Sequence, residues 1–518
     1  MTALSVPTPE EHEALLFQRA YPPTPKALLR AERGLAGFAR RVARLRKAGA
    51  DLAAFEEPEV SGIAGTAFSA IFSYEVAKRL LELEPGRLEI DWERYEATDR
   101  MAMAWRRLFP LVEEDTMVEA HVPYLEWLRR AAGGLASALA WLISRLEALP
   151  IPAKDKAELY ASLELPLRWD LGDSQAARTV IALPRRKNFY HQGPLIRRSE
   201  VLLEQELASA PLPIKRLNVE GGQAFLNMAL ATSAVRYREL HGFTFGDPNL
   251  VIEADAGRGV DIFLCGVPEH LRLPLRAYHA AMIFKNGVPV GYAETLSLFD
   301  RMEVGFNVYY TFRDGETAWI FARVLHLFHQ ILATTSFAID PYQIGLGNPE
   351  GVASGAFWFY RKLGFRPVLP EVARLVAAEE CKMLRVPGYR TPAGTLRRLA
   401  AGQLVFEMPG APQGDWDSFS ARNVALAAQG ESPEDAVASV SRDLGIKAGP
   451  HPEFARLALV LDLIPDLADW PRDEKAALLD IIRAKMGPDE SLYVRLMQKH
   501  ARLREAIREL GQVGSTLG

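Results

Sequence analysis

The chain has 518 residues, of which 49% are hydrophobic and 24% charged, and its formal net charge at pH 7 is −4. This composition is that of a globular protein and excludes a fibrous or disordered chain, while the length predicts more than one hydrophobic core. The two signs of charge are nearly balanced and no long run of one sign occurs, so charge does not indicate nucleic acid as a partner.

The cysteines and the N-terminal residues predict the compartment. Cys265 and Cys381 lie far apart and have no metal-ligand spacing, which fits a reducing compartment. Residues 1–13 carry acidic residues and prolines instead of a basic region followed by an apolar core, so they do not resemble a secretory signal. The most apolar stretch, 135–149, is short for a spanning helix and contains Arg145. We expect a cytoplasmic protein without membrane insertion.

The first part of the chain is predicted to be mostly helical. Apolar residues recur at three- and four-residue steps through much of residues 1–150, with a short strand expected at 88–92. No catalytic constellation stands out in this helical lobe. Residues 151–204, with their prolines and basic clusters, are interpreted as a connecting segment.

The middle of the chain predicts strands and helices in a defined order. Two β-hairpins are expected, at 251–266 around Gly257-Arg258-Gly259 and at 277–298 around Asn286-Gly287, where Asn-Gly is a strong hairpin signal. The elements that follow are a strand, a helix, a strand and a helix, at 304–312, 319–334, 336–344 and 356–365.

The last of these helices carries a motif. Ala356, Tyr360, Gly364 and Phe365 have the spacing A-x-x-x-Y-x-x-x-G-F. This resembles the signature that ends the acyl-CoA-binding core of the GNAT N-acyltransferase superfamily. The resemblance implies an α+β fold, in which a GNAT-like mixed sheet with helices occupies residues 205–395. Mostly helical regions would flank it at 1–150 and at 396–518.

The resemblance also implies a cofactor loop. In GNAT enzymes the loop Q/R-x-x-G-x-G/A follows the fourth strand, and its amides hold the pyrophosphate of coenzyme A at the start of a helix. Here Arg313 and Ala318 match the first and last positions, but Glu316 replaces the central glycine. Carboxylates oppose pyrophosphate binding unless they point away. Acidic residues in the first turn also stabilise any helix, which is an alternative explanation for Glu316.

The cofactor-binding residues implied by the resemblance are Arg313, Gly315, Glu316, Thr317, Ala318 and Asn348. Asn348 follows the strand at 336–344, as a family asparagine often does, although it can equally be the N-cap of the last helix. The co-substrate would be acyl-CoA. We expect no metal, because His326 and His329 are three residues apart but lack an evident third ligand.

Three residues are candidates for catalysis. In the family, the tyrosine at the position of Tyr360 lies near the sulfur of coenzyme A and often protonates the leaving thiolate. The alternative is a buried tyrosine whose hydroxyl finds a local partner. For the base that deprotonates the amine, Glu303 is the first candidate and Glu294 the second. Each of these two can instead be an ordinary paired or surface carboxylate on a strand.

The predicted function is transfer of an acyl group from a thioester donor, acyl-CoA, to an amine of a small molecule or a protein. The alternative is a non-catalytic GNAT-shaped binding or scaffold protein that has lost coenzyme A binding. Glu316 favours this alternative. So does the pattern after Phe365, where residues 370–382 predict a helix in place of the strands of a GNAT core and 404–408 are only a short apolar piece.

Overall fold

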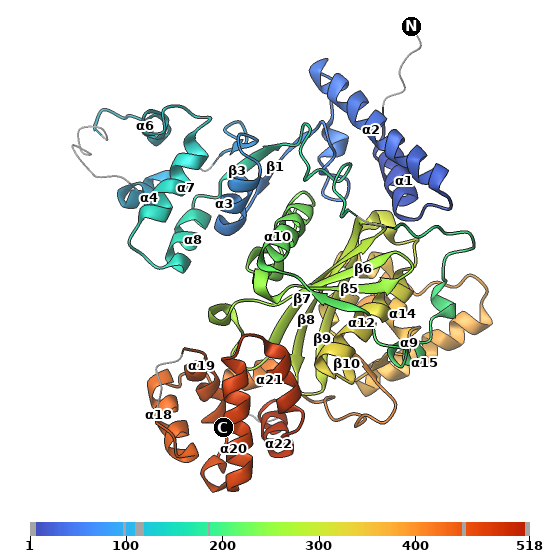
Figure 1. Cartoon of the computed structure of the whole chain (residues 1–518), viewed down its shortest axis with the longest axis vertical. Coiled ribbons are helices and arrows are strands. Elements are labelled where there is room, and N and C mark those ends of the chain that lie inside the picture. Colours follow the sequence, from blue (N-terminus) through green and yellow to red (C-terminus); the bar gives the residue numbers. More distant parts are fainter. Residues whose placement is uncertain (1–6, 97–99, 109–118, 185–186, 448–451, 513–518) are drawn as a thin grey trace. The chain divides into compact units, whose positions relative to one another are not determined.

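The computed structural model describes residues 7–96, 100–108, 119–184, 187–447 and 452–512 (Figure 1). The chain forms two compact units. Unit 1 comprises Met1–Gln192, Gln223–Thr244 and Lys285–Pro289, and unit 2 comprises Gly193–Gly222, Phe245–Phe284 and Val290–Gly518. The units are therefore built from interleaved segments, whereas the sequence pattern predicted four consecutive regions. The two divisions differ because the sequence pattern reflects only local composition, whereas the units depend on which distant segments pack together.

Unit 1 combines helices with a small antiparallel sheet. Its strands, in the order β1-β3-β2, are β1 (Ala67–Ile71), β2 (Leu88–Ile90) and β3 (Pro166–Asp170). Its helices are α1 (Pro9–Ala20), α2 (Pro25–Lys47), α3 (Tyr74–Leu83), α4 (Arg100–Leu108), α6 (Tyr124–Ala131), α7 (Ala138–Ala148), α8 (Ala153–Ala161) and α11 (His241–Thr244). Helix α10 (Val219–Ala234) begins in unit 2 and ends in unit 1.

The predicted helical lobe thus contains a sheet. The strand expected at 88–92 is present as β2, but β1 and β3 were not predicted. Both are five-residue strands, and β3 lies in the stretch interpreted as a connection. Such short strands leave little periodicity in the sequence. The buried side chains of Phe68 and Trp169 stabilise the sheet, with their rings 5.8 Å apart.

The tip of the second predicted hairpin belongs to unit 1. Asn286 and Gly287 have φ angles of 48° and 79°, as the predicted turn requires. The Asn286 side chain donates to the carbonyl oxygens of Ala20 (2.8 Å) and Phe189 (3.0 Å). The carbonyl oxygen of Gly287 accepts from the N–H of Leu183 at 2.8 Å. The turn therefore joins α1 to residues 183–189.

We expect Gly287→Ala to destabilise unit 1 by about 1–3 kcal/mol. A Cβ at Gly287 would lie 2.4 Å from the carbonyl oxygen of Leu183, and the positive φ adds strain. Gly86→Ala is the matched control, because Gly86 has a similar φ of 75° but no atom within 4 Å of its Cβ position. Hydrogen exchange of peptides from unit 1 measures both. Equal losses for the two variants would contradict the role assigned to the Leu183 contact.

Unit 2 is built on a nine-stranded sheet, drawn in green and yellow in Figure 1. The strand order is β11-β12-β10-β9-β8-β7-β6-β5-β4. The strands are β4 (Ile214–Arg216), β5 (Ile252–Gly257), β6 (Val260–Cys265), β7 (Ala277–Lys285), β8 (Val288–Leu298), β9 (Arg301–Val308), β10 (Ser336–Ile339), β11 (Arg366–Pro367) and β12 (Leu404–Glu407). β9 and β10 are parallel, while β8 and β9 are antiparallel. The predicted α+β fold with a mixed central sheet and flanking helices is confirmed.

The sheet continues past the region that the sequence pattern indicated. β12 pairs with β10 on one side and with β11 on the other, antiparallel to both. The helix predicted at 370–382 is α15 (Pro370–Arg385), and it is followed by α16 (Ala393–Leu399). These helices lie between β11 and β12 in the chain, so they are an insertion between paired strands. β12 lies beyond the predicted boundary at residue 395. Because α15 and α16 separate β11 from β12 in the sequence, the local pattern does not indicate that the two strands pair.

The helices of unit 2 include α12 (Thr317–Leu332), which connects β9 to β10. Besides α15 and α16, the others are α9 (Leu203–Leu207), α13 (Pro349–Ser354), α14 (Ala356–Arg361), α17 (Ala421–Ala427), α18 (Pro433–Leu444), α19 (Pro452–Leu461), α20 (Arg472–Lys485), α21 (Glu490–Met497) and α22 (Ala501–Leu510). The Lys485 ammonium donates to Glu490, and both side chains are at most 4% exposed. Arg272 donates to the carbonyl oxygens of Lys485 (2.8 Å) and Gly487 (2.7 Å). These bonds hold the corner between α20 and α21 against the segment that leads into β7.

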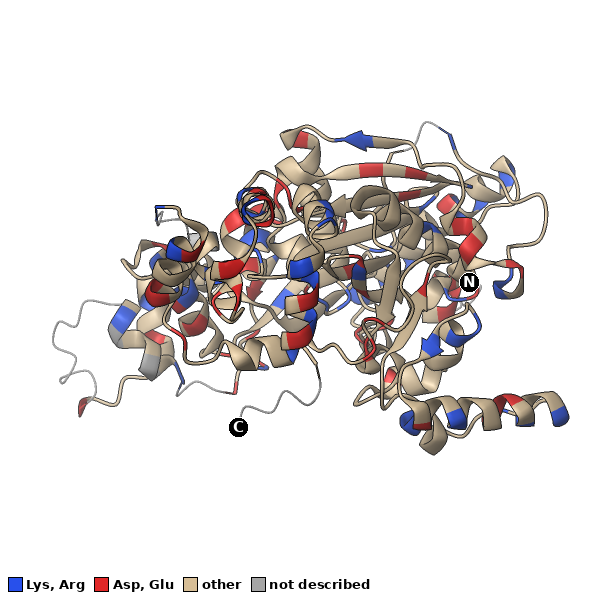
Figure 2. Ribbon diagram, turned by 90° about the horizontal axis from the view of Figure 1, so that it is seen from below, with Lys and Arg blue, Asp and Glu red and all other residues tan. Residues whose placement is uncertain are grey.

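Charged residues of both signs are interspersed over the ribbon, as Figure 2 shows. In the part of the chain that the structure describes, no helix is both long and apolar enough to cross a membrane.

Candidate functional site

The parallel strands β9 and β10 part soon after they meet. They pair over three residues, from Arg301↔Ser336 to Glu303↔Ala338. Beyond Glu303, β9 continues to Val308, and no described strand pairs with that edge. The N–H of Tyr309 donates to the carbonyl oxygen of Val290 on β8, so the odd-numbered residues of β9 bond to β8. The backbone groups of Val304 and Phe306 therefore point toward the side from which β10 diverges.

Polar side chains gather on one face of the sheet at this point. Glu294 is directly opposite Gly305, and Glu303 is opposite Leu296, so the two glutamates share a face. A Cβ on Gly305 would lie 3.4 Å from Nε2 of Gln343, in the turn after β10. The sequence analysis did not single out Gln343, because only the fold brings it to β9.

The two predicted bases have different surroundings. Glu303 accepts hydrogen bonds from Arg276 (2.9 Å) and Arg301 (2.7 Å). Burial by itself would raise the pKa of Glu303, but the two guanidinium groups outweigh it and hold the pKa below its usual value. Such a carboxylate is a weak base. Glu294 accepts from the hydroxyl of Tyr278 and makes no ion pair with a described residue. Glu294 is therefore better suited than Glu303 to accept a proton.

Residues of the predicted cofactor loop make hydrogen bonds and an ion pair within the fold. Arg313 pairs with Glu350 and lies 3.8 Å from the ring centroid of Tyr310. The N–H of Gly315 donates to the carbonyl oxygen of Phe312 at 2.9 Å, and the Thr317 hydroxyl donates to that of Arg313 at 3.1 Å.

Glu316 is the most enclosed residue of this loop, with an exposed fraction of 0%. Its carboxylate accepts from the guanidinium of Arg258 and from the N–H of Ile196 (3.2 Å) and does not cap α12. Ala318 is also buried. The residue at the position of the family's central glycine is therefore a buried, paired carboxylate. The sequence indicated Arg258 only as a turn residue, because its partner lies on a distant segment.

Asn348 serves as the N-cap of α13. Its side-chain oxygen accepts from the N–H of Gly351 at 3.1 Å, and its amide nitrogen donates to the carbonyl oxygen of Tyr342 at 3.0 Å. Both ends of the side chain are thus engaged in local structure.

Tyr360 lies in an aromatic cluster on the α12 side of the sheet. Its ring centroid is 5.5 Å from that of Phe321, which also contacts Phe306 of β9. The residue is 3% exposed, and none of the described residues hydrogen-bonds its hydroxyl. Burial raises the pKa of Tyr360, so the phenol is protonated at neutral pH. Tyr360 and Glu294 lie on opposite faces of the sheet, and the parting of β9 and β10 is where a ligand could contact both.

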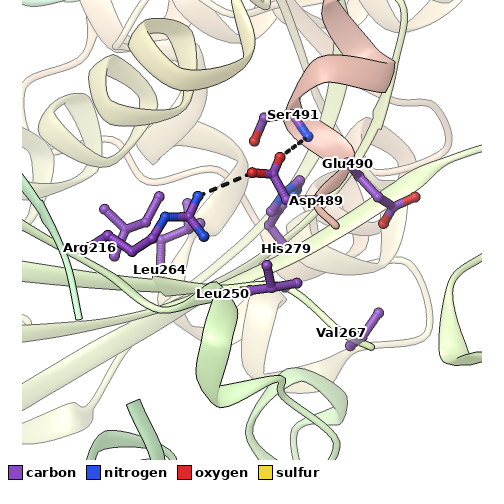
Figure 3. A pocket seen from close by; sticks show the side chains of 10 residues that line it. Arg216, Leu250, Leu264, Val267, His279, Asp489, Glu490 and Ser491 are labelled. Carbon is purple, nitrogen blue, oxygen red and sulfur yellow. Dashed lines mark hydrogen bonds and ion pairs between the residues drawn. The ribbon is translucent and has the colours of Figure 1, made fainter. Parts of the chain in front are cut away.

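A separate hollow in unit 2 is lined by His279, Asp489 and Glu490 (Figure 3). Its volume of about 20 Å³ holds little more than a water molecule. Arg216 pairs with Asp489 at 3.1 Å, and Asp489 caps α21 through the N–H of Ser491. His279 is 5% exposed, and burial lowers its pKa, so the imidazole is neutral at neutral pH. This hollow is too small for an acyl donor.

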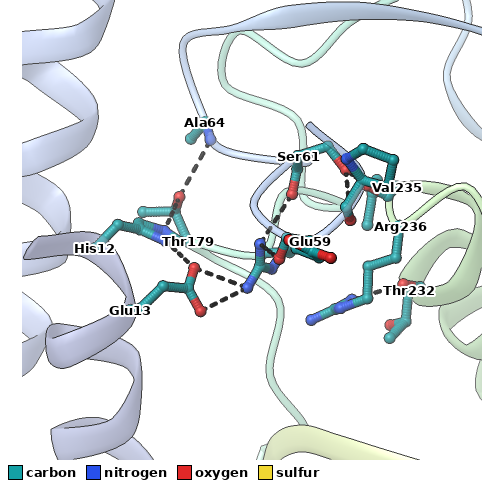
Figure 4. A network of polar contacts seen from close by, with 11 residues as sticks. His12, Glu13, Glu59, Ser61, Ala64, Thr179, Thr232, Val235 and Arg236 are labelled. Atoms are coloured by element: carbon teal, nitrogen blue, oxygen red, sulfur yellow. Dashed lines mark hydrogen bonds and ion pairs between the residues drawn. The ribbon is translucent and has the colours of Figure 1, made fainter. Parts of the chain in front are cut away.

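Unit 1 contains a polar network that resembles a catalytic relay (Figure 4). The His12 imidazole contacts Glu13 at 3.2 Å and the Thr179 hydroxyl at 2.9 Å. Arg178 donates to both carboxylate oxygens of Glu13 at 2.8 Å and to the carbonyl oxygen of Ser61 at 3.1 Å. His12 is 0% and Thr179 4% exposed, and the Thr179 hydroxyl is engaged both by His12 and by the N–H of Ala64, which donates to it at 3.1 Å. The network is structural and connects α1 to the loop around Ser61.

Over the described ranges, no group of three or more His, Cys, Asp or Glu residues is placed to hold a metal ion. Comparison of the chain with protein-family models, curated proteins and solved structures found no match.

Proposed function

We propose that unit 2 is an N-acyltransferase domain of GNAT type, which moves an acyl group from a thioester donor to an amine of a small molecule or a protein. The observation that carries this proposal is the parting of β9 from β10 beside Glu294, with Tyr360 on the opposite face. An extended thioester arm between the two strands would use the open edge of β9 for hydrogen bonds. The exposed side chains of Tyr310, Tyr342 and Leu346, which follow β9 and β10, would provide an apolar rim.

The chemistry assigns one role to each residue. The amine attacks the thioester carbonyl, so a C–N bond forms and the C–S bond breaks. Glu294 takes the proton that the ammonium group must lose, either directly or through a water molecule. The Tyr360 hydroxyl gives its proton to the leaving thiolate. The nitrogen loses its second proton to solvent as the amide forms, which balances the proton that Tyr360 regains from solvent. The donor we propose is acyl-CoA, and we propose a cytoplasmic location, which the two separated cysteines favour.

A second function is favoured by Glu316. Glu316 stands where the family loop has a glycine, and its buried carboxylate, paired with Arg258, takes the place of open space at the start of α12. On this alternative, unit 2 is a GNAT-shaped binding or scaffold module without acyl transfer. Calorimetric titration with acetyl-CoA, longer acyl-CoAs and free CoA separates the two functions. Binding that Glu316→Gly strengthens supports the enzyme. A folded protein that binds none of these donors supports the scaffold.

For the enzyme, we expect Glu294→Gln to lower kcat by about 100-fold or more while leaving donor affinity unchanged, because the amide cannot accept the proton. The measurement is release of free thiol from the acyl-CoA that binds, with a panel of amines. Tyr278→Phe is the control: it removes the hydrogen bond to Glu294 but keeps the carboxylate, so its loss should be much smaller. Full activity of Glu294→Gln would exclude Glu294 as the base.

A further inference from the structure

The insertion between β11 and β12 presents an unpartnered surface. Val372 and Val376 are on the buried side of α15, while Leu384 at its end is 87% exposed and Val386 just beyond it is 51% exposed. The exposed side also carries Cys381. The label α15 marks this helix in Figure 1. Two strongly exposed aliphatic side chains therefore lie two positions apart at the end of α15.

The exposed charged residues of the insertion are mainly positive. The carboxylate of Glu379 accepts from Lys382 (2.6 Å) and Tyr389 (2.8 Å), and that of Glu380 accepts from Arg361 (2.9 Å). These two acidic residues are therefore neutralised within the fold, while Glu371 stands in the first turn of α15. The insertion also carries arginines that are exposed and have no ion-pair partner among the described residues: Arg374, Arg385, Arg390, Arg397 and Arg398.

We infer that the segment from α15 to α16 docks on an anionic membrane surface. Guanidinium groups bind lipid phosphates and are attracted by the negative potential of such a surface. Leu384 and Val386 would enter the boundary between headgroups and acyl chains, where aliphatic side chains gain by leaving water. A nucleic acid or an acidic peptide would also attract the arginines, but neither explains the two aliphatic side chains. Docking of this kind requires no spanning helix and is independent of the acyltransferase proposal.

The test uses the full chain and the exposed thiol of Cys381. The other cysteine, Cys265, is buried, and burial raises its pKa to about 12, so a thiol-directed, polarity-sensitive dye labels Cys381 selectively. We expect the emission to shift to shorter wavelength with vesicles that contain phosphatidylglycerol, but not with vesicles of phosphatidylcholine alone. Flotation of unlabelled protein with the same vesicles checks that the dye does not cause binding. Higher salt should weaken binding.

Two double variants separate the contribution of the aliphatic side chains from that of the arginines. Leu384→Ser with Val386→Ser should remove most of the emission shift. Arg397→Glu with Arg398→Glu should weaken flotation by about ten-fold or more, since each basic residue near an anionic surface contributes measurably.

Leu426→Ser and Arg472→Glu are matched controls, because both residues are exposed but lie on α17 and α20. The inference is overturned if the controls lose as much binding as the test variants. It is also overturned if phosphatidylcholine binds equally well, or if the protein binds an oligonucleotide, an acidic peptide or itself through these residues and not the vesicles.

Discussion

Arg178→Met is expected to lower the stability of unit 1 by about 3–5 kcal/mol, because it removes the guanidinium that pairs with the carboxylate of Glu13 and donates to two carbonyl oxygens. The side chain of Arg178 is 1% exposed, and its guanidinium donates to Glu13, to the carbonyl oxygen of Ser61 and to that of Glu59. Methionine fills much of the space but donates nothing. Hydrogen exchange of peptides from α1 and from residues 59–66 measures the loss where it arises.

The control for this variant is Arg87→Met, which breaks surface ion pairs with Asp173 and Glu84 and should cost far less. A double variant, Arg178→Met with Glu13→Gln, should recover part of the stability, because the uncompensated charge is then gone. If Arg178→Met costs no more than Arg87→Met, the network around His12 does not hold unit 1 together.

Lys485→Met should destabilise unit 2 by a similar amount, about 3–5 kcal/mol. The Lys485 ammonium donates to Glu490 and, at 3.1 Å, to the carbonyl oxygen of Arg276, and it lies 4.5 Å from the ring centroid of Tyr493. Without it, Glu490 keeps a buried charge that has lost its main partner. Protection of peptides from α20 and α21 against hydrogen exchange should fall first.

Two further variants test this explanation. Arg483→Met, on the same helix, breaks an exposed pair with Asp480 and is expected to change stability by less than about 0.5 kcal/mol. Lys485→Met combined with Glu490→Leu should recover much of the loss, because both charges are then removed from the interior. No recovery in the double variant would mean that packing of the lysine stem, and not its charge, holds this corner.

Local signals predicted most of the elements of unit 2. Asn286-Gly287 placed the second hairpin, and the apolar periodicity after Arg313 placed α12. The strands that were missed, β1, β3, β4, β11 and β12, have two to five residues, and each is defined by a partner far along the chain. Whether such a short segment forms a strand depends on its pairing partner more than on its own residues.

The candidate site was predicted less completely than the fold. The alternation of residues in β8 and β9 is enough to put Glu294 and Glu303 on strands, and the register then puts them on one face. Arg301 is two positions from Glu303 on the same strand, but the contacts of Glu303 with Arg276 and of Glu294 with Tyr278 join residues 27 and 16 positions apart. The contact between Glu316 and Arg258 is of the same kind, since 58 positions separate the two residues. No spacing rule in the sequence could have predicted these pairs.

The position of β12 has a consequence for synthesis of the chain on the ribosome. β10 ends at Ile339, but the strand that covers its second edge is not made until Leu404–Glu407. In the interval, an edge with the buried side chains of Phe337 and Ile339 is available to any other extended chain. A polypeptide that stopped at residue 395 would keep this edge permanently. Aggregation of such a fragment would then reflect an unfinished sheet rather than a failure of the preceding strands to fold.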